Sequence, residues 1–174
     1  FASFKNFKEL VSSTALLPEV WTLGNYEDIF SRVNFITAFN NSVISATTVT
    51  VATLFTSAVL GYIFAKYHFW GKEQLFLLLL VTMMVPFAVV LVPLYITIGD
   101  IGLINHLGGI IVTGLWSTFG IFFMRQFMES IPSELIDAAR IDGASEWRIF
   151  LGIVVPMSTA PLAALAVFVF LGNW

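Results

Sequence analysis

Four long stretches of this sequence carry no charged residue, at about residues 43–65, 75–98, 107–124 and 154–174. A helix rises about 1.5 Å per residue, so the first stretch is long enough to cross the hydrocarbon core of a bilayer. The sequence therefore predicts an all-α fold, a polytopic transmembrane helical bundle with about four spans.

The composition agrees with a membrane protein. Hydrophobic residues make up 58 % of the chain, charged residues 11 %, and the mean hydropathy is +0.90, whereas about 25 % of the residues of a soluble domain are charged. The net charge of −3 without a basic cluster argues against a nucleic-acid partner. The absence of cysteine excludes a disulfide framework and thiol chemistry.

The uncharged spans also exclude several kinds of activity. A charged side chain at the centre of a span costs about 2.5 to 3.5 kcal/mol on insertion scales, so proteins retain one there for a purpose. Their absence argues against a proton-coupled transporter with its own carboxylate relay. An intramembrane metalloprotease would need histidines at metal-ligand spacing, and residues 71–73, Gly-Lys-Glu, are not a phosphate-binding loop. We expect no enzyme activity, metal or cofactor in this chain.

One polar segment, residues 125–155, separates the third apolar stretch from the fourth. Pro132 presets a helical φ near the start of a first short helix, where a missing N–H costs little. Leu135, Ala138 and Ala139 recur at i, i+3 and i+4, which predicts one apolar face. The two alanines keep that face low enough for another surface to approach closely.

A glycine turn and a second helix are predicted to follow. Asp137 and Arg140, three residues apart, fall together on a more polar face of the first helix. Gly143 is placed to end that helix, because glycine adopts the left-handed conformation without a steric penalty. Ser145 can cap the second helix, with Glu146 in its first turn.

The spacing of this segment resembles a known motif. Asp-Ala-Ala at 137–139, three residues, Gly143, nine residues and then Ile-Val-Val-Pro at 153–156 is similar to the "EAA" motif of the membrane subunits of bacterial ABC importers. That motif reads Glu-Ala-Ala, x3, Gly, x9, Ile-x-Leu-Pro. Asp137 replaces the usual Glu, so its carboxylate reaches one methylene less far, and Val155 replaces Leu.

The resemblance implies a function for the segment. In this family the loop is cytoplasmic, and its first helix sits in a cleft of the ATP-hydrolysing subunit. The implied coupling residues here are Asp137, Ala138, Ala139, Asp142, Gly143, Ile153 and Pro156. The alternative is an ordinary amphipathic connector between two spans.

The same resemblance implies partners and a fold. It predicts a type I importer permease in a bacterial inner membrane, in contact with lipid, a second related permease and two copies of a cytoplasmic ATPase. ATP and Mg would bind to the ATPase, and an extracytoplasmic solute-binding protein would deliver the substrate. Residues 18–26 resemble the sugar-transporting branch (the maltose and glycerol-phosphate type), which favours a sugar as the solute.

The predicted topology has two parts. Residues 1–38 are expected to be an extracytoplasmic segment, and residues 39–174 a transmembrane permease domain with a cytoplasmic coupling loop at 125–153. Lysine and arginine near the membrane are more frequent on the side of this loop, in agreement with the positive-inside rule. By the resemblance, further spans are expected before and after this sequence.

Two details concern the spans themselves. Pro86 and Pro93 are predicted to bend the second span, because each removes a backbone donor and clashes with the preceding turn. Ser57, Gly61 and Ala65, four residues apart, form a small-residue stripe on which a neighbouring helix can pack closely.

Two other classes of function remain open at this stage. A secondary transporter would work without an ATPase, with a flux that follows an ion gradient. A membrane scaffold subunit would keep the loop for binding but would tolerate a blocked pathway. The sequence does not identify the residues that contact a substrate.

Overall fold

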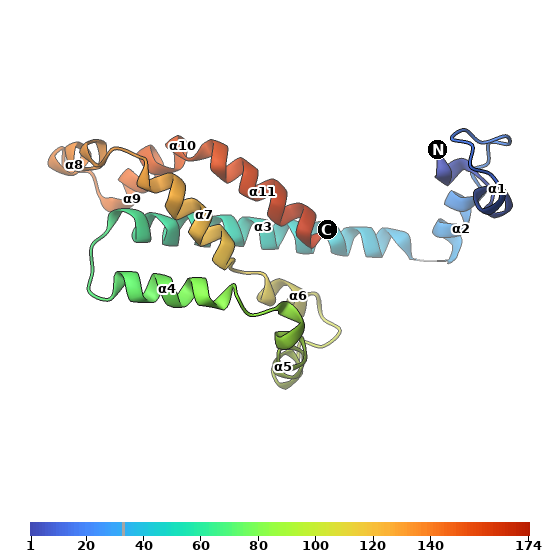
Figure 1. Cartoon of the computed structure of the whole chain (residues 1–174), viewed down its shortest axis with the longest axis horizontal. Coiled ribbons are helices and arrows are strands. Elements are labelled where there is room, and N and C mark those ends of the chain that lie inside the picture. The colour runs from blue at the N-terminus through green and yellow to red at the C-terminus, as the bar shows by residue number, and fades with distance from the viewer. Residues whose placement is uncertain (33) are drawn as a thin grey trace. The chain divides into compact units, whose positions relative to one another are not determined.

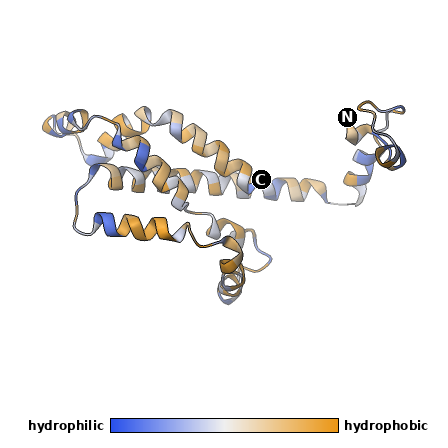
Figure 2. Cartoon of the chain, in the orientation of Figure 1, coloured by the Kyte–Doolittle hydropathy of each residue, from blue (hydrophilic) through white to orange (hydrophobic). Residues whose placement is uncertain are grey.

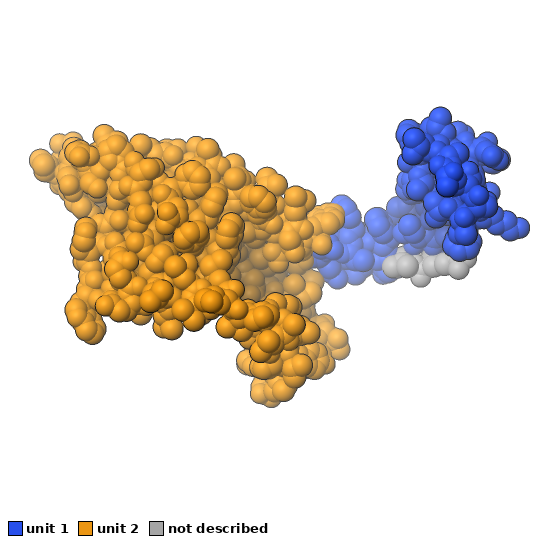
Figure 3. Space-filling view, in the orientation of Figure 1, with its two compact units in different colours: residues 1–43 blue, residues 44–174 orange. Residues whose placement is uncertain are grey.

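The computed structural model describes residues 1–32 and 34–174, and over these residues all regular structure is helical. The all-α class is therefore confirmed. The chain divides into two compact units, Phe1–Val43 and Ile44–Trp174 (Figure 3). The predicted boundary at 38/39 falls inside helix α3 (Phe35–Lys66), which begins in the first unit and continues into the second.

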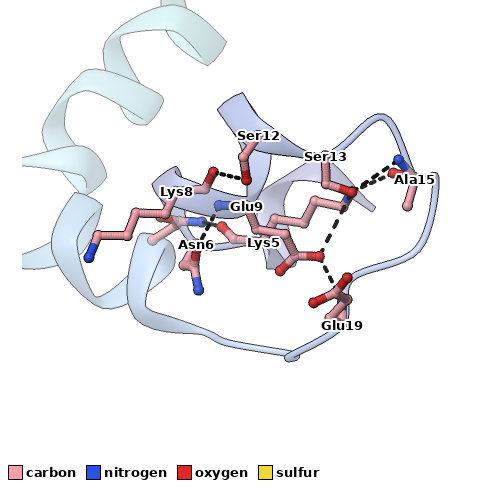
Figure 4. A network of polar contacts seen from close by, with 9 residues as sticks. Lys5, Asn6, Lys8, Glu9, Ser12, Ser13, Ala15 and Glu19 are labelled. Atoms are coloured by element: carbon pink, nitrogen blue, oxygen red, sulfur yellow. Dashed lines mark hydrogen bonds and ion pairs between the residues drawn. The ribbon is translucent and has the colours of Figure 1, made fainter.

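The first unit also contains a short 3-10 helix, Ala2–Phe4, and helices α1 (Phe7–Ser12) and α2 (Gly24–Arg32). A polar network holds its loop (Figure 4). Lys5, 4 % exposed, donates to the carbonyl of Ala15, and Glu9 accepts from the backbone N–H of Glu19 at 2.7 Å. Asn6 caps α1 by accepting from the N–H of Glu9.

The second unit continues with helices joined by short connections. They are α4 (Lys72–Thr82), α5 (Phe87–Asp100), α6 (Leu107–Thr113), α7 (Thr118–Glu129), α8 (Ser133–Ile141), α9 (Glu146–Ile149), a π-helix (Phe150–Val154), α10 (Val155–Met157) and α11 (Thr159–Asn173). Helix α8 lies at the end of the unit where α3 turns into α4, and α5 and α6 lie toward the other end (Figure 1). Hydrophilic residues gather around α8, while α4 and α5 are mostly hydrophobic (Figure 2).

Only one described helix, α3, is long and apolar enough to cross a membrane by itself. Three pairs of helices meet the same criteria when each pair is taken as one bent span, which gives up to four spans. The bends are 94° between α4 and α5, 41° between α6 and α7, and 78° between Glu146–Met157 and α11. The stretches 75–98, 107–124 and 154–174 are thus not continuous helices.

Proline explains part of these helix breaks. Pro86 is the N-cap of α5 with ψ 135°, an extended conformation, and it has no N–H for the carbonyl of Thr82, the last residue of α4. Pro93 lies inside α5 without ending it, and the 94° bend lies at the break between α4 and α5, before Pro93. Pro161 lies in the first turn of α11, just after the bend at Ser158, where a missing N–H is tolerated.

Close packing of α3, α7 and α11 forms the centre of the second unit. A Cβ on Gly120 of α7 would lie 2.3 Å from Ser57 Oγ and 3.4 Å from a methyl of Leu165, so three helices meet there. A Cβ on Gly61 would lie 2.7 Å from the Cβ of Met124. The predicted small-residue stripe is therefore confirmed as a packing surface.

Helices extend into both ends of the predicted loop, residues 125–153. Residues 125–129 belong to the end of α7, and the helix that contains Pro156 already begins at Glu146. The non-helical part is confined to short connections on either side of α8. Pro156 cannot donate to the carbonyl of Gly152, and the turn before it is the π-helix Phe150–Val154.

Candidate functional site

The end of α8 is a complete glycine turn. Gly143 has φ +79°, in the left-handed region. Its N–H donates to the carbonyl of Arg140 at 3.0 Å, and the N–H of Ala144 donates to that of Ala139 at 3.0 Å. These are the two bonds of a Schellman motif, which satisfies carbonyls left free at a helix end. The predicted turn is confirmed.

The second helix begins as predicted. The Ser145 hydroxyl accepts from the N–H of Arg148, which caps α9, and Glu146 lies in the first turn. Pro132 is the N-cap of α8 with φ −58°, one position before the first helical residue. The helix, glycine turn and helix therefore follow from local sequence features.

Helix α8 has an inner and an outer apolar side. Ile136 is 2 % exposed and belongs to the core formed with α3, α7 and α11, and the partly buried Ala139 packs against that core. Leu135 and Ala138 are exposed, and Ile141 is 86 % exposed. The apolar face predicted from residues 135, 138 and 139 is thus divided: Ala139 faces the core, whereas Leu135, Ala138 and Ile141 form what we call the outer stripe.

A polar cluster connects α8 to α9 and to the end of α3. Arg140 donates to both carboxylate oxygens of Glu146, at 2.8 and 3.2 Å, and to Asp137 at 3.2 Å. The hydroxyl of Tyr67, just after α3, donates to Glu146, and the guanidinium lies 5.7 Å from the Tyr67 ring centre. We call Tyr67, Arg140 and Glu146 the clamp.

The clamp shifts the acidity of its members. The hydrogen bonds from Arg140 and then from Tyr67 hold the pKa of Glu146 below its usual range. Burial, and then the hydrogen bond to Glu146, raise the pKa of Tyr67, and the bond to Glu146 raises the pKa of Arg140. At neutral pH the cluster is therefore an ion pair with a neutral phenol.

Lys66 and Arg125 tie together the helices around α8. Lys66, the last residue of α3, donates to the carbonyls of Glu129, at 3.1 Å, and Ile131, beyond the end of α7. Arg125 of α7 bonds Glu129 at 2.8 Å and lies 3.8 Å from the ring centre of Phe76 in α4. These contacts join the end of α3 to the end of α7, and α7 to α4, next to the segment that leads into α8.

The structure places the residues implied by the motif as follows. Asp137 is 63 % exposed and pairs with Arg140, and Asp142 is the exposed C-cap of α8. Ile153 lies in the π-helix and packs against the core, and Pro156 is exposed in α10. Asp137 and Asp142 thus lie before the Gly143 turn, and Ile153 and Pro156 lie on the helical segments after it.

Sequence reasoning missed the clamp and the anchor Ile136. It paired Arg140 with Asp137, which is correct, but Glu146 is the partner with two hydrogen bonds. Tyr67 and Glu146 are 79 positions apart, so no local pattern connects them. The spacing of Ile136 and Ala139, i and i+3, could have predicted that both lie on the inner side of α8.

A family model and several relatives of this chain all describe membrane components of transport systems. Residues 57–174 match the model of the binding-protein-dependent transport system inner membrane component. The diacetylchitobiose uptake system permease NgcG of Streptomyces coelicolor is 33 % identical, over 99 % of this chain and 58 % of the relative. The arabinooligosaccharides permease AraQ of Halalkalibacterium halodurans is 36 % identical, over 99 % and 63 %.

Another relative and a solved structure extend the comparison. The lactose permease LacG of Rhizobium radiobacter is 39 % identical over 86 % of this chain and 55 % of the relative. The crystal structure of a bacterial ABC transporter involved in the import of the acidic polysaccharide alginate shares the fold, with a TM-score of 0.87, at 22 % identity over 99 % of this chain and 61 % of that one.

The chain spans about three fifths of the length of these relatives. The resemblance to the carbohydrate branch of the type I importer permeases is confirmed by the family match and by the sugar permeases among the relatives. The fold is that of an ABC importer permease. The chain belongs to the family of inner membrane components of binding-protein-dependent transport systems.

Proposed function

We propose that this chain is a membrane-spanning subunit of an ATP-driven importer in a bacterial inner membrane, and that it forms part of the pathway of a small sugar or oligosaccharide. The family match and the sugar permeases among its relatives support the proposal. The subunit itself carries no ATPase role; ATP and Mg bind to two copies of a cytoplasmic partner. A second related permease completes the pathway, and a solute-binding protein delivers the sugar.

The exposed outer stripe of α8 is the observation that carries the proposal. The contact with the ATPase is proposed to lie on this stripe. Ile141 is 86 % exposed on a helix whose opposite side is anchored by Ile136. Burying an isoleucine side chain contributes about 1.5 to 3 kcal/mol. A short helix that is anchored in the core on one side and exposes an apolar stripe on the other can dock into a cleft of another protein.

The clamp and the hydrogen bonds of Lys66 transmit the motion of α8. When the two ATPases close on nucleotide, the α8 helices of the two permeases are drawn together. Arg140 carries this displacement to Glu146, and so to the helix that leads into α11, while Tyr67 carries it to α3. The bent spans then change their tilt, which alternates access to the pathway.

Uptake by the reconstituted complex tests this proposal. The full-length chain, its partner permease, the ATPase and the binding protein are placed in proteoliposomes, and sugar uptake is measured with ATP or with imposed ion gradients. ATP-dependent uptake supports the importer. Uptake that follows an ion gradient without ATP would identify a secondary transporter, and a complex without uptake under either condition would identify a scaffold.

A further inference from the structure

The connection between α6 and α7 interrupts an apolar segment with non-helical backbone. Free backbone groups at membrane depth are tolerated where protein satisfies them or where they line a cavity. Here α3 supplies the donors: Thr53 bonds the carbonyl of Gly114 at 2.8 Å, and Thr56 bonds that of Leu115 at 3.2 Å. A Cβ on Gly114 would lie 2.7 Å from a methyl of Val49, so the connection is held tightly against α3.

A cavity of about 320 Å³ opens beside this connection, among α3, α7 and α11. This volume is at the lower end of the range of about 300 to 1,000 Å³ for small-molecule sites. The residues that define its chemistry are Thr53, Trp116, Ser117, Phe119, Phe168 and Asn173. The residues Trp116 and Phe168 are 66 % and 65 % exposed, so their side chains are accessible to a ligand.

The chemistry of the lining selects a neutral, hydroxyl-rich ring. Among the described residues that line the cavity none is charged, which disfavours an ion that would lose its hydration there. Aromatic faces offer a large rigid surface to the C–H face of a sugar. The Asn173 amide donates to the carbonyl of Val169 at 2.8 Å, which leaves its Oδ1 as an acceptor for a sugar hydroxyl.

Ser117 completes this arrangement. Its Oγ accepts from the N–H of Gly120 at 3.1 Å as the cap of α7, which orients the hydroxyl so that its own proton can be donated. Trp116 precedes it in the connection, next to the residues that Thr53 and Thr56 hold against α3. Substrate sites in membrane transporters are commonly built at such discontinuous helices.

We propose that this cavity is a sugar-contacting site of the transport pathway, with Trp116 as the stacking surface and Asn173 and Ser117 as hydrogen-bonding groups. The inference rests on the proposed import function and assigns to it a substrate-contacting site. It makes Trp116 a determinant of which sugar is carried.

The test is uptake kinetics of the full complex in proteoliposomes, with lactose, diacetylchitobiose and arabinotriose as probes. Trp116→Ala should raise KM for the transported sugar about tenfold, the size of one lost aromatic contact, while ATP hydrolysis by the complex persists. Trp116→Phe should restore most of the affinity. Leu115→Ala, in the same connection but outside the lining, is the matched control and should leave KM unchanged.

A second measurement does not depend on transport. Because the chain has no cysteine, a single Ser117→Cys can be alkylated by a small thiol reagent, and the transported sugar should slow this reaction. Ser130→Cys, beyond α7, should react at a rate independent of sugar. Unchanged KM in Trp116→Ala together with no protection at residue 117 would overturn the site while the importer stands. No ATP-driven uptake of any probe by the unaltered complex would contradict the proposed function and this inference together.

Discussion

At two breaks in the helical structure of this protein, the free backbone carbonyls find their hydrogen-bond donors in opposite ways. The Gly143 turn between α8 and α9 is satisfied by its own neighbours, through N–H groups of Gly143 and Ala144. The connection between α6 and α7 is satisfied by Thr53, which lies 61 positions away. The first can therefore move as a unit with its helices, whereas the second is fixed to α3. The two proposals therefore place coupling at the self-contained turn and substrate contact at the fixed connection.

The largest expected effect is at the self-contained turn. Gly143→Pro removes the N–H that donates to Arg140 and fixes φ near −65°, whereas the turn needs +79°. We expect the rate of ATP-driven uptake to fall at least tenfold, which corresponds to an increase of about 1.4 kcal/mol in the activation free energy of uptake.

The control for this variant is Gly143→Asn, because asparagine tolerates the left-handed region. A Cβ at this position would meet no atom within 4 Å, so steric clashes do not confuse the result. The asparagine variant should retain most of its uptake. Normal uptake by Gly143→Pro would show that the turn plays no part in coupling.

The next effect concerns the fixed connection. Thr53→Val keeps the shape of a side chain that is 1 % exposed but leaves the carbonyl of Gly114 without its donor. An unsatisfied buried group costs about 1 to 3 kcal/mol, so the thermal midpoint of the purified complex should fall.

Thr56→Val provides the comparison, because the Thr56 hydroxyl is shared among the carbonyls of Ala52, Thr53 and Leu115. Its effect on the midpoint should be smaller. Equal midpoints for Thr53→Val and the unaltered protein would mean that α3 does not hold this connection.

The smallest effect is that of pH on the clamp. The folded protein lowers the pKa of Glu146, so the stabilisation is present above the pKa of the unfolded chain, about 4.3, and is lost as the pH falls through the folded value. Both Arg140 and Glu146 are more than a third exposed, so we expect about 1 kcal/mol or less.

Glu146→Gln measures this contribution. The difference in thermal midpoint between this variant and the unaltered protein should be present at pH 7 and should vanish under acidic conditions. A difference that persists unchanged below the folded pKa would mean that packing of the side chain, and not its charge, stabilises the clamp.

The same contrast explains what the sequence could predict. Gly143 and Ser145 act on neighbours within a few residues, so their geometry follows from residue type and spacing. The clamp and the Thr53 contact join residues that only the packed helices bring together. Pro86 and Pro93 have the same chemistry, yet Pro86 begins α5 after the 94° bend between α4 and α5, whereas Pro93 lies inside α5, and the sequence does not distinguish the two positions.

Cysteine crosslinking in native membranes tests the central claim, that α8 docks onto an ATPase. Ala138→Cys and Ala139→Cys are introduced separately into the cysteine-free chain and paired with cysteines on the proposed ATPase partner. We predict a crosslink from the exposed position 138 whose yield changes with ATP, and a weaker one from position 139, which packs against the core. No crosslink from Ala138→Cys, in a folded protein whose loop reacts with a cytoplasmic thiol reagent, would contradict the claim.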